Sequence, residues 1–232
     1  MSLMDKDTEF QEKLQKEKYE TMRRDQRIKV RRISELNQGM KKHQILFTGS
    51  SLMELFPIEE LRVSLDIEPV IYNRGIGGFT TDDFLENIHP MLLEPEPSKV
   101  FINIGTNDIA DRETKEGHWL THLIVNYEAI LKKLKSALPE CEVYMMSYYP
   151  VNLEKLRAGA GKDAVIVRTN ENVNRANQAV KDLSEKYGYH YIDVNQGLTD
   201  ENGELKQEFT MDGIHMYPDA YKIVLENMKP YL

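Results

Sequence analysis

The sequence has little of what several common classes of protein require. Its single cysteine, Cys141, excludes an intrachain disulfide framework, and the strand-like residues around it are typical of a buried thiol. No stretch is apolar over the length that a bilayer requires, and the N-terminus has no apolar run before its dense charges. We therefore expect neither a disulfide scaffold nor a membrane span, and we expect a cytoplasmic location.

Positive charge is also scarce. Lysine and arginine together number 30 against 38 aspartate and glutamate residues, which gives a formal net charge of −8. Nucleic-acid binding depends on clustered cations, so we expect no nucleic-acid partner and favour a neutral or cationic small-molecule substrate. With 232 residues, 41% of them hydrophobic, the chain is long enough for one sizeable core.

Motifs for metals and nucleotide cofactors are incomplete. His118 and His122 are four residues apart on a predicted helix, but neither a third ligand nor an H-E-x-x-H pattern accompanies them. The glycines at 75–78 do not form G-x-G-x-x-G, because Thr80 stands where the third glycine belongs. We expect no metal and no cofactor.

Apolar runs alternate with helical patterns after residue 40, which predicts an α/β domain over residues 41–232. Strands are expected near residues 44–48, 69–73, 98–104, 141–148 and 189–193, and helices near 51–65, 80–93, 115–138, 166–187 and 217–229. Such alternation favours right-handed crossovers and a five-stranded parallel sheet that is covered on both faces. Ligands of such sheets bind outside the carboxyl ends of the strands.

The first 40 residues are predicted to form a helical extension. Residues 5–38 are highly charged, contain no proline and are followed by Gly39, which indicates one long helix. Its apolar residues follow a helical stripe only loosely. Two interpretations stay open: a solvated helix that lies across the domain, or an arm that forms a homodimer. In either case we expect the helix to be unnecessary for the chemistry.

Two distant segments supply the groups of nucleophilic acyl transfer. Ser50 and Ser51 follow a predicted strand, and Asp212 precedes His215 by three residues near the other end of the chain. An imidazole can take the serine proton while a carboxylate holds the ring in the correct tautomer. The D-x-x-H spacing puts both side chains on one side of the backbone if the segment is helical. On its own the spacing favours a helix N-cap followed by a surface histidine.

Two further segments could stabilise an oxyanion. Residues 101–108 form an apolar run that ends in a glycine turn with Asn107 at its mouth, and residues 70–78 form another that ends in glycines. Developing negative charge on a tetrahedral oxygen is met by fixed donors, such as a backbone N–H beside glycine or an asparagine amide. Gly78 and Asn107 fit these requirements.

These four segments resemble the four ordered sequence blocks of the SGNH, or GDSL-type, hydrolases, and especially the branch with platelet-activating-factor acetylhydrolase-like enzymes. The resemblance covers roughly residues 45–217. It implies a flavodoxin-like three-layer α/β/α fold and hydrolysis of esters without a metal or cofactor. It also implies that Ser51 is the nucleophile and that Asp212 and His215 are the catalytic acid and base. The amides of Ser51, Gly78 and Asn107 would be the three oxyanion donors.

One position departs from the family pattern. Ser50 stands where the first block has aspartate, so the sequence leaves open which serine attacks, although the preceding strand and the following leucine favour Ser51. The family's aspartate is not part of the triad. We expect it to bond neighbouring backbone, a function that serine can share.

Several features keep two interpretations. Residues 149–165 are either a mobile surface loop or a wall or lid of the substrate pocket. Arg74 contacts either a substrate carboxylate or a neighbouring acid, and Asn103 bonds either the active-site turns or buried backbone.

We expect a serine esterase for short-chain or acetyl esters of carbohydrates or lipids. The alternatives are a non-catalytic ligand-binding module on the same fold and a flavodoxin-like cofactor carrier.

Overall fold

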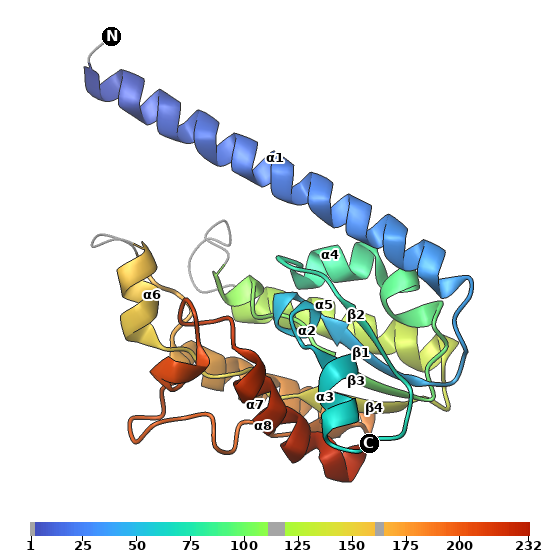
Figure 1. Ribbon diagram of the computed structural model, residues 1–232. Helices are drawn as coiled ribbons and strands as arrows, with labels where there is room; N and C mark the ends of the chain where they lie inside the picture. The colour runs from blue at the N-terminus through green and yellow to red at the C-terminus, as the bar shows by residue number, and fades with distance from the viewer. Residues whose placement is uncertain (1–2, 111–118, 161–164) are drawn as a thin grey trace.

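The computed structural model describes residues 3–110, 119–160 and 165–232, and it contains a five-stranded parallel sheet (Figure 1). The strands are β1 (Ile45–Gly49), β2 (Ile71–Gly75), β3 (Lys99–Asn103), β4 (Glu142–Met146) and β5 (His190–Ile192). All neighbouring pairs are parallel, and their order is β2-β1-β3-β4-β5. The predicted strands and the predicted sheet are confirmed.

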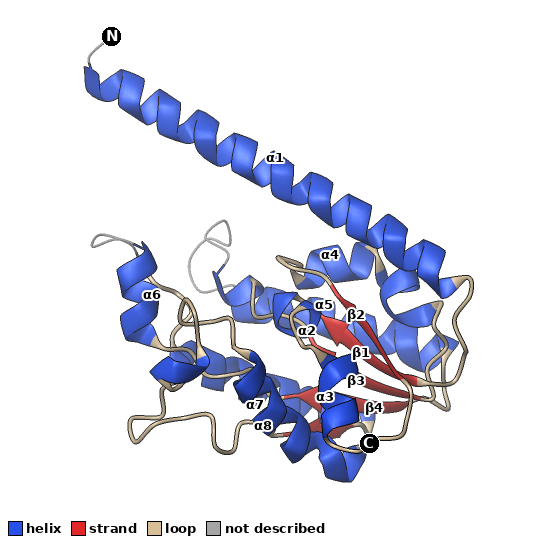
Figure 2. Ribbon diagram, viewed as in Figure 1, coloured by secondary structure: helices blue, strands red, loops and turns tan. Residues whose placement is uncertain are grey.

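Helices cover both faces of the sheet (Figure 2). Alternate strand residues point to opposite faces, so Val100 and Ile102 belong to one apolar cluster and Phe101 to the other. The first cluster includes residues of α1 (Leu3–Asn37), α4 (Thr81–Glu86), α5 (Trp119–Ala137) and α7 (Asn170–Tyr187). The second includes residues of α2 (Ser51–Glu54), α3 (Ile58–Ser64) and α8 (Pro218–Met228). This is the predicted three-layer α/β/α fold.

Some helices differ from the prediction at proline residues. The helix expected at 51–65 is divided into α2 and α3 by Pro57. Of the helix expected at 80–93, only α4 is α-helical, and it ends at Glu86. A π-helical turn that contains Pro90, η1 (His89–Leu93), follows it. Proline lacks the N–H that a continuous helix needs, which explains both breaks. The described residues also form three short 3₁₀ segments, namely η2 (Asp108–Ala110), η3 (Gln207–Phe209) and η4 (Lys229–Tyr231).

The segment 149–165 also differs from a simple loop. It contains a helix, α6 (Leu153–Ala160), which no periodicity had indicated. Asn152 donates its backbone N–H to Gly213 O at 2.9 Å, so the segment packs against the loop that carries Asp212 and His215. Residues 161–164 lie outside the described residues.

The predicted N-terminal helix is present as α1, and its two halves have different surroundings. Near its C-terminal end, Ile33 and Asn37 are buried against the body. Its N-terminal half extends away from the body past α4 (Figure 1), and Phe10 and Tyr19 are 61% and 58% exposed there. The predicted homodimer arm and the cytoplasmic location stay predictions. Within the described ranges, no helix is both long and apolar enough to cross a membrane.

The strand order places the candidate site. It reverses between β1 and β3, and in open parallel sheets ligands bind at such a reversal, outside the carboxyl ends of the strands. Ser51 lies two residues after the end of β1, and the Gly105–Asn107 turn follows β3. Two of the four predicted segments therefore meet at this point.

Candidate active site

The turn after β1 presents Ser51 and buries Ser50. Gly49 has φ +153°, and a Cβ there would lie 2.0 Å from Asn103 O, so only glycine fits. Ser50 is fully buried, with its hydroxyl 3.4 Å from Thr106 Oγ1. Although it occupies the N-cap position of α2, its side chain makes no capping bond. Ser51 is the partly exposed serine of the pair.

Ser51, His215 and Asp212 form one hydrogen-bonded chain. Ser51 Oγ lies 3.0 Å from His215 Nε2, and His215 Nδ1 lies 2.6 Å from Asp212 Oδ2. An ionised carboxylate only accepts hydrogen bonds, so it selects the tautomer with the proton on Nδ1. This tautomer leaves Nε2 free to accept the proton of the Ser51 hydroxyl. The three residues that the sequence predicted to act together are brought together.

The D-x-x-H segment forms a turn and not a helix. Asp212 Oδ1 accepts the backbone N–H groups of Ile214 at 2.9 Å and His215 at 2.8 Å, which curls the backbone around the carboxylate. Helix α8 begins only at Pro218. Partial burial alone would raise the pKa of Asp212, but hydrogen bonds from the His215 ring and these two N–H groups lower it below its ordinary value.

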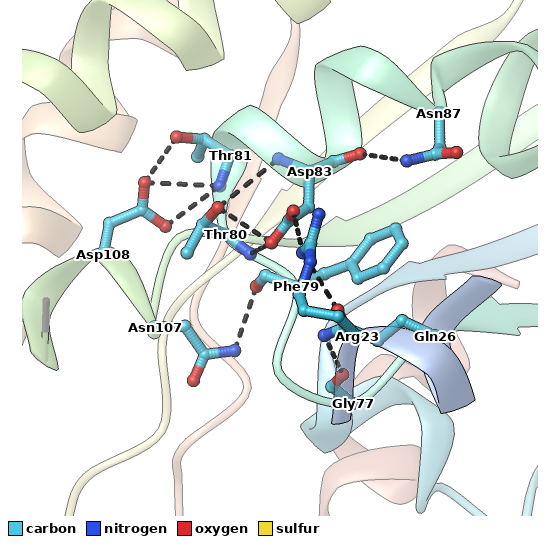
Figure 3. Close-up of polar contacts among 10 residues, drawn as sticks. All are labelled: Arg23, Gln26, Gly77, Phe79, Thr80, Thr81, Asp83, Asn87, Asn107 and Asp108. Carbon is cyan, nitrogen blue, oxygen red and sulfur yellow. Dashed lines mark hydrogen bonds and ion pairs between the residues drawn. The ribbon is translucent and has the colours of Figure 1, made fainter. Parts of the chain in front are cut away.

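The predicted oxyanion donors lie on neighbouring loops. A Cβ built on Gly77 would be 3.8 Å from Ser51 Cβ, so the glycine loop passes beside the serine. Gly78 has φ +75°, the left-handed conformation that favours glycine. Asn107 Nδ2 donates to Phe79 O at 2.9 Å, which joins the two loops (Figure 3). No described residue accepts a hydrogen bond from the N–H of Ser51 or Gly78.

Arg168 is a site residue that the sequence analysis missed. Its Nη2 donates to Asn107 Oδ1 at 2.9 Å, so both ends of the Asn107 amide are held. Burial lowers the pKa of Arg168 to about 10, against the raising effect of Asp212 and Asp108, and the group stays a cation at neutral pH. Its Nε is buried without a partner among the described residues. Its only sequence signal is its place directly before the Thr169 N-cap of α7, which does not distinguish it from other loop arginines.

Asp108 is a second residue that was missed. It is buried, and its carboxylate accepts hydrogen bonds from the hydroxyl and the backbone N–H of Thr81 at the start of α4 (Figure 3). Burial raises the pKa of Asp108 to about 6, although the bonds from Thr81 oppose this shift. Asp108 therefore ties the Asn107 turn to α4.

The remaining candidates lie away from this chemistry. Arg74 is buried, and its Nε donates to Asn37 Oδ1 on α1 at 2.8 Å, so it joins α1 to β2 and not to a substrate. Asn103 Nδ2 donates to Ser147 O at 3.0 Å, which satisfies buried backbone. His122 Nε2 lies 2.6 Å from Asp82 Oδ2, and His118 lies outside the described residues. In the described part of the chain, no cluster of three or more potential ligands could hold a metal.

Comparisons with known proteins identify the family of this chain. Residues 59–223 match the model of the GDSL-like Lipase/Acylhydrolase family, a range that includes Gly78, Asn107, Asp212 and His215 and begins after Ser51. A structure from Streptococcus pneumonia, described provisionally as a platelet activating factor, is 31% identical, covers 92% of this chain and 95% of its own, and superposes with a TM-score of 0.80.

More distant proteins share the fold. A GDSL-like lipase from Bacteroides thetaiotaomicron is 18% identical with a TM-score of 0.70, covering 87% of this chain and 96% of its own. The acetyl xylan esterase AlAXEase is 16% identical with a TM-score of 0.65, covering 81% and 98%.

A curated relative is longer than this chain. The N-acylneuraminate cytidylyltransferase of Escherichia coli is 28% identical over 184 residues, which are 79% of this chain and 38% of that protein. This chain thus spans less than half the length of that relative. The family match covers more than half of the chain, and the Streptococcus structure is similar over nearly all of it. The chain belongs to the GDSL-like lipase/acylhydrolase family.

Proposed function

We propose that this hydrolase is a serine esterase that cleaves short-chain carboxylic esters with Ser51 as nucleophile. The observation that carries the proposal is the chain of hydrogen bonds from Ser51 Oγ through His215 to Asp212, at 3.0 and 2.6 Å. These distances lie in the range that a nucleophile, its base and the orienting carboxylate require. The lowered pKa of Asp212 keeps the orienting group ionised at neutral pH.

The reaction has two halves. His215 Nε2 takes the Ser51 proton as Oγ attacks the carbonyl carbon, and the resulting oxyanion accepts hydrogen bonds from the N–H of Ser51, the N–H of Gly78 and the Asn107 amide. Collapse breaks the bond to the alcohol oxygen, which leaves with the proton from His215. Water then gives its proton to His215 and attacks the acyl-enzyme. The acid is released, and the proton returns to Ser51.

We propose a small acetyl ester, such as an acetylated carbohydrate, as the substrate class. The side chains of His215 and Asp212 are 30% and 49% exposed, so the reacting groups are open to a soluble substrate. The net charge of −8 disfavours a polyanion. An acetyl xylan esterase has the same fold, which shows that the fold accommodates such chemistry.

We also propose that residues 149–160 form one wall of the substrate site. A Cβ built on Gly213, between Asp212 and His215, would lie 2.6 Å from Asn152 O and 2.8 Å from Leu156 Cγ. The segment thus supports the loop that carries both groups. Leu156→Ala is expected to change the preference for acyl chain length, and an unchanged preference would contradict this assignment.

Labelling with a fluorophosphonate, followed by peptide mapping, tests the nucleophile. We expect the label on Ser51 and no label on the Ser51→Ala variant. A series of p-nitrophenyl esters of rising chain length, together with acetylated sugars, then tests the substrate class. A label on Ser50, or equal labelling of Ser51→Ala, would contradict the assignment of the nucleophile, and the absence of any ester hydrolysis would contradict the function.

A further inference from the structure

Helix α1 makes a direct hydrogen bond to the loop of the proposed oxyanion donor. Gln26 is only 3% exposed, and its Nε2 donates to Gly77 O at 2.9 Å (Figure 3). Burying a side-chain amide is costly unless it is hydrogen-bonded, so the contact fixes both the side chain and the carbonyl. This contact joins residues 51 positions apart.

The bonded carbonyl belongs to the same peptide unit as the Gly78 N–H. A peptide unit is planar and trans, so the C=O of Gly77 and the N–H of Gly78 point in opposite directions and rotate together. Glycine on both sides of this unit opposes such a rotation less than any other residue would. By holding Gly77 O, Gln26 therefore sets the direction in which the Gly78 N–H points.

Two ion pairs on α1 support the same loop. Arg23 Nη1 donates to Gln26 Oε1 at 2.9 Å and pairs with Asp83, the residue whose carboxylate accepts the Thr80 N–H at 3.1 Å in the capping box of α4 (Figure 3). The hydrogen bond to Asp83 raises the pKa of Arg23 despite some burial. The guanidinium thus orients the Gln26 amide and joins it to the end of the loop.

The other ion pair acts on the preceding peptide unit. Glu54 Oε2 accepts the Gly77 N–H at 2.6 Å, while its Oε1 lies 2.8 Å from Lys29 Nζ on α1. Gly77 is therefore held by its N–H and by its C=O, and α1 contributes to both contacts.

Side chains of the same helix also approach Gly78. A Cβ built on Gly78 would lie 2.9 Å from Gln26 Nε2 and 3.2 Å from Met22 Sδ. The ends of the Gln26 and Met22 side chains therefore lie directly against Gly78.

We propose that α1 orients the oxyanion donor of Gly78, with Gln26 as the positioning residue and Arg23 and Lys29 as its supports. The proposal rests on the proposed esterase function. It replaces the expectation that the helix is unnecessary for the chemistry.

The test compares an ester with its thionoester in the full-length protein. A thionoester carries sulfur in place of the carbonyl oxygen, and sulfur is a weak hydrogen-bond acceptor, so its hydrolysis depends less on the oxyanion donors. A misdirected Gly78 N–H lowers kcat for the ester more than for the thionoester. A loss of folded enzyme lowers both rates by the same factor, so the ratio of the two separates positioning from stability.

The variant is Gln26→Met, which keeps the length of the side chain and removes the donor. We expect kcat for the ester to fall about 10-fold to 100-fold with little change in KM, because a lost oxyanion donor costs up to about 1,000-fold and a misdirected one costs less. The ester-to-thionoester ratio should fall by a similar factor. Arg23→Met, at a side chain that is 29% exposed, should lower the same ratio less and serves as the deciding variant if Gln26→Met does not fold.

Asn37→Leu is the matched control. Asn37 is a buried amide on the same helix. Its Nδ2 donates to the backbone O of Pro90 at 2.9 Å and its Oδ1 accepts from Arg74 Nε at 2.8 Å, so it has no bond to the Gly77–Gly78 peptide unit. We expect it to lower stability and to leave the ratio at the wild-type value. A wild-type ratio in Gln26→Met and Arg23→Met, or an equal fall in Asn37→Leu, would overturn the proposal. A wild-type protein that hydrolyses no ester would instead contradict the proposed function itself.

Discussion

The Asp212 carboxylate has two separable functions, because its two oxygens have different partners. Oδ2 lies 2.6 Å from the His215 ring, and Oδ1 holds the turn through two backbone N–H groups. Replacing Asp212 with asparagine keeps an oxygen for the turn but presents an NH₂ group to His215 Nδ1. The ring then accepts at Nδ1 and carries its proton on Nε2, where it cannot take the proton of Ser51.

The magnitudes follow from these contacts. Asp212→Asn should lower kcat by about 10⁴-fold, the effect of the wrong tautomer in a triad, and should leave the free energy of unfolding nearly unchanged. Asp212→Ala should be equally inactive. It also loses both bonds to the turn, at about 0.5–1.5 kcal/mol each, so it should lower the free energy of unfolding by about 1–3 kcal/mol.

Rates on p-nitrophenyl acetate and urea denaturation of both variants provide the assay. Asp219→Asn is the control, since Asp219 is exposed and its Oδ1 accepts a backbone N–H from Ala220 at 2.9 Å. It should keep wild-type activity and stability. If Asp212→Asn retained more than about a tenth of the wild-type kcat, the carboxylate would not set the tautomer of His215 and the reasoning would fail.

Four further outcomes are expected. Ser51→Ala should lower kcat at least about 10⁴-fold, whereas Ser50→Ala should stay within about tenfold of wild type; the reverse order would assign the nucleophile to Ser50. Arg168→Met should lower kcat about 10-fold, because the Asn107 amide loses one of its two hydrogen bonds. Asn107→Ala should lower kcat about 100-fold to 1,000-fold, and equal losses in the two variants would contradict this order. Because the pKa of Asp108 is raised to about 6, the folded state binds more protons than the unfolded state between about pH 4 and 6. The stability contributed by this carboxyl therefore falls as the pH rises through that window, by about 3 kcal/mol at most. Urea denaturation of the wild type and of Asp108→Asn at several pH values should show this fall as a changing difference in the free energy of unfolding, and a difference that is independent of pH would refute it. A chain that begins at residue 21 removes the projecting half of α1, and light scattering should show half the native mass if that half is a dimer arm.

The sheet and the chain order of the site could be predicted because both depend on local patterns. Buried parallel strands appear as short apolar runs. These runs end at Gly49, Gly75 and Asn103, and the turns follow them. Parallel connectivity then brings those turns to one edge whatever the details of packing. The two broken helices could also have been foreseen, since Pro57 and Pro90 stand inside the predicted ranges.

Contacts between distant side chains could not be predicted. Nothing in the sequence distinguishes Arg168, which holds Asn107, from Arg157, which lies on α6, because burial and partner are set by tertiary packing. The turn geometry at Asp212 was also missed: D-x-x-H fits a helix as well as a turn, and Gly213 with φ +95° decides between them. Spacing gives the order of such groups and leaves their geometry open.

The same limit explains why α1 looked like an appendage. A charged helix with a weak apolar stripe shows little sign of burial in its sequence. Ile33 does pack into the core, but the hydrogen bonds that hold the glycine loop come from Gln26 and from the ion pairs of Arg23 and Lys29. Hydrophobic periodicity reports apolar burial, and it does not detect a helix that is attached by hydrogen bonds. Whether a charged extension before the first block acts on the site of an enzyme of this family is therefore better decided by asking whether it carries a buried amide that faces the glycine loop.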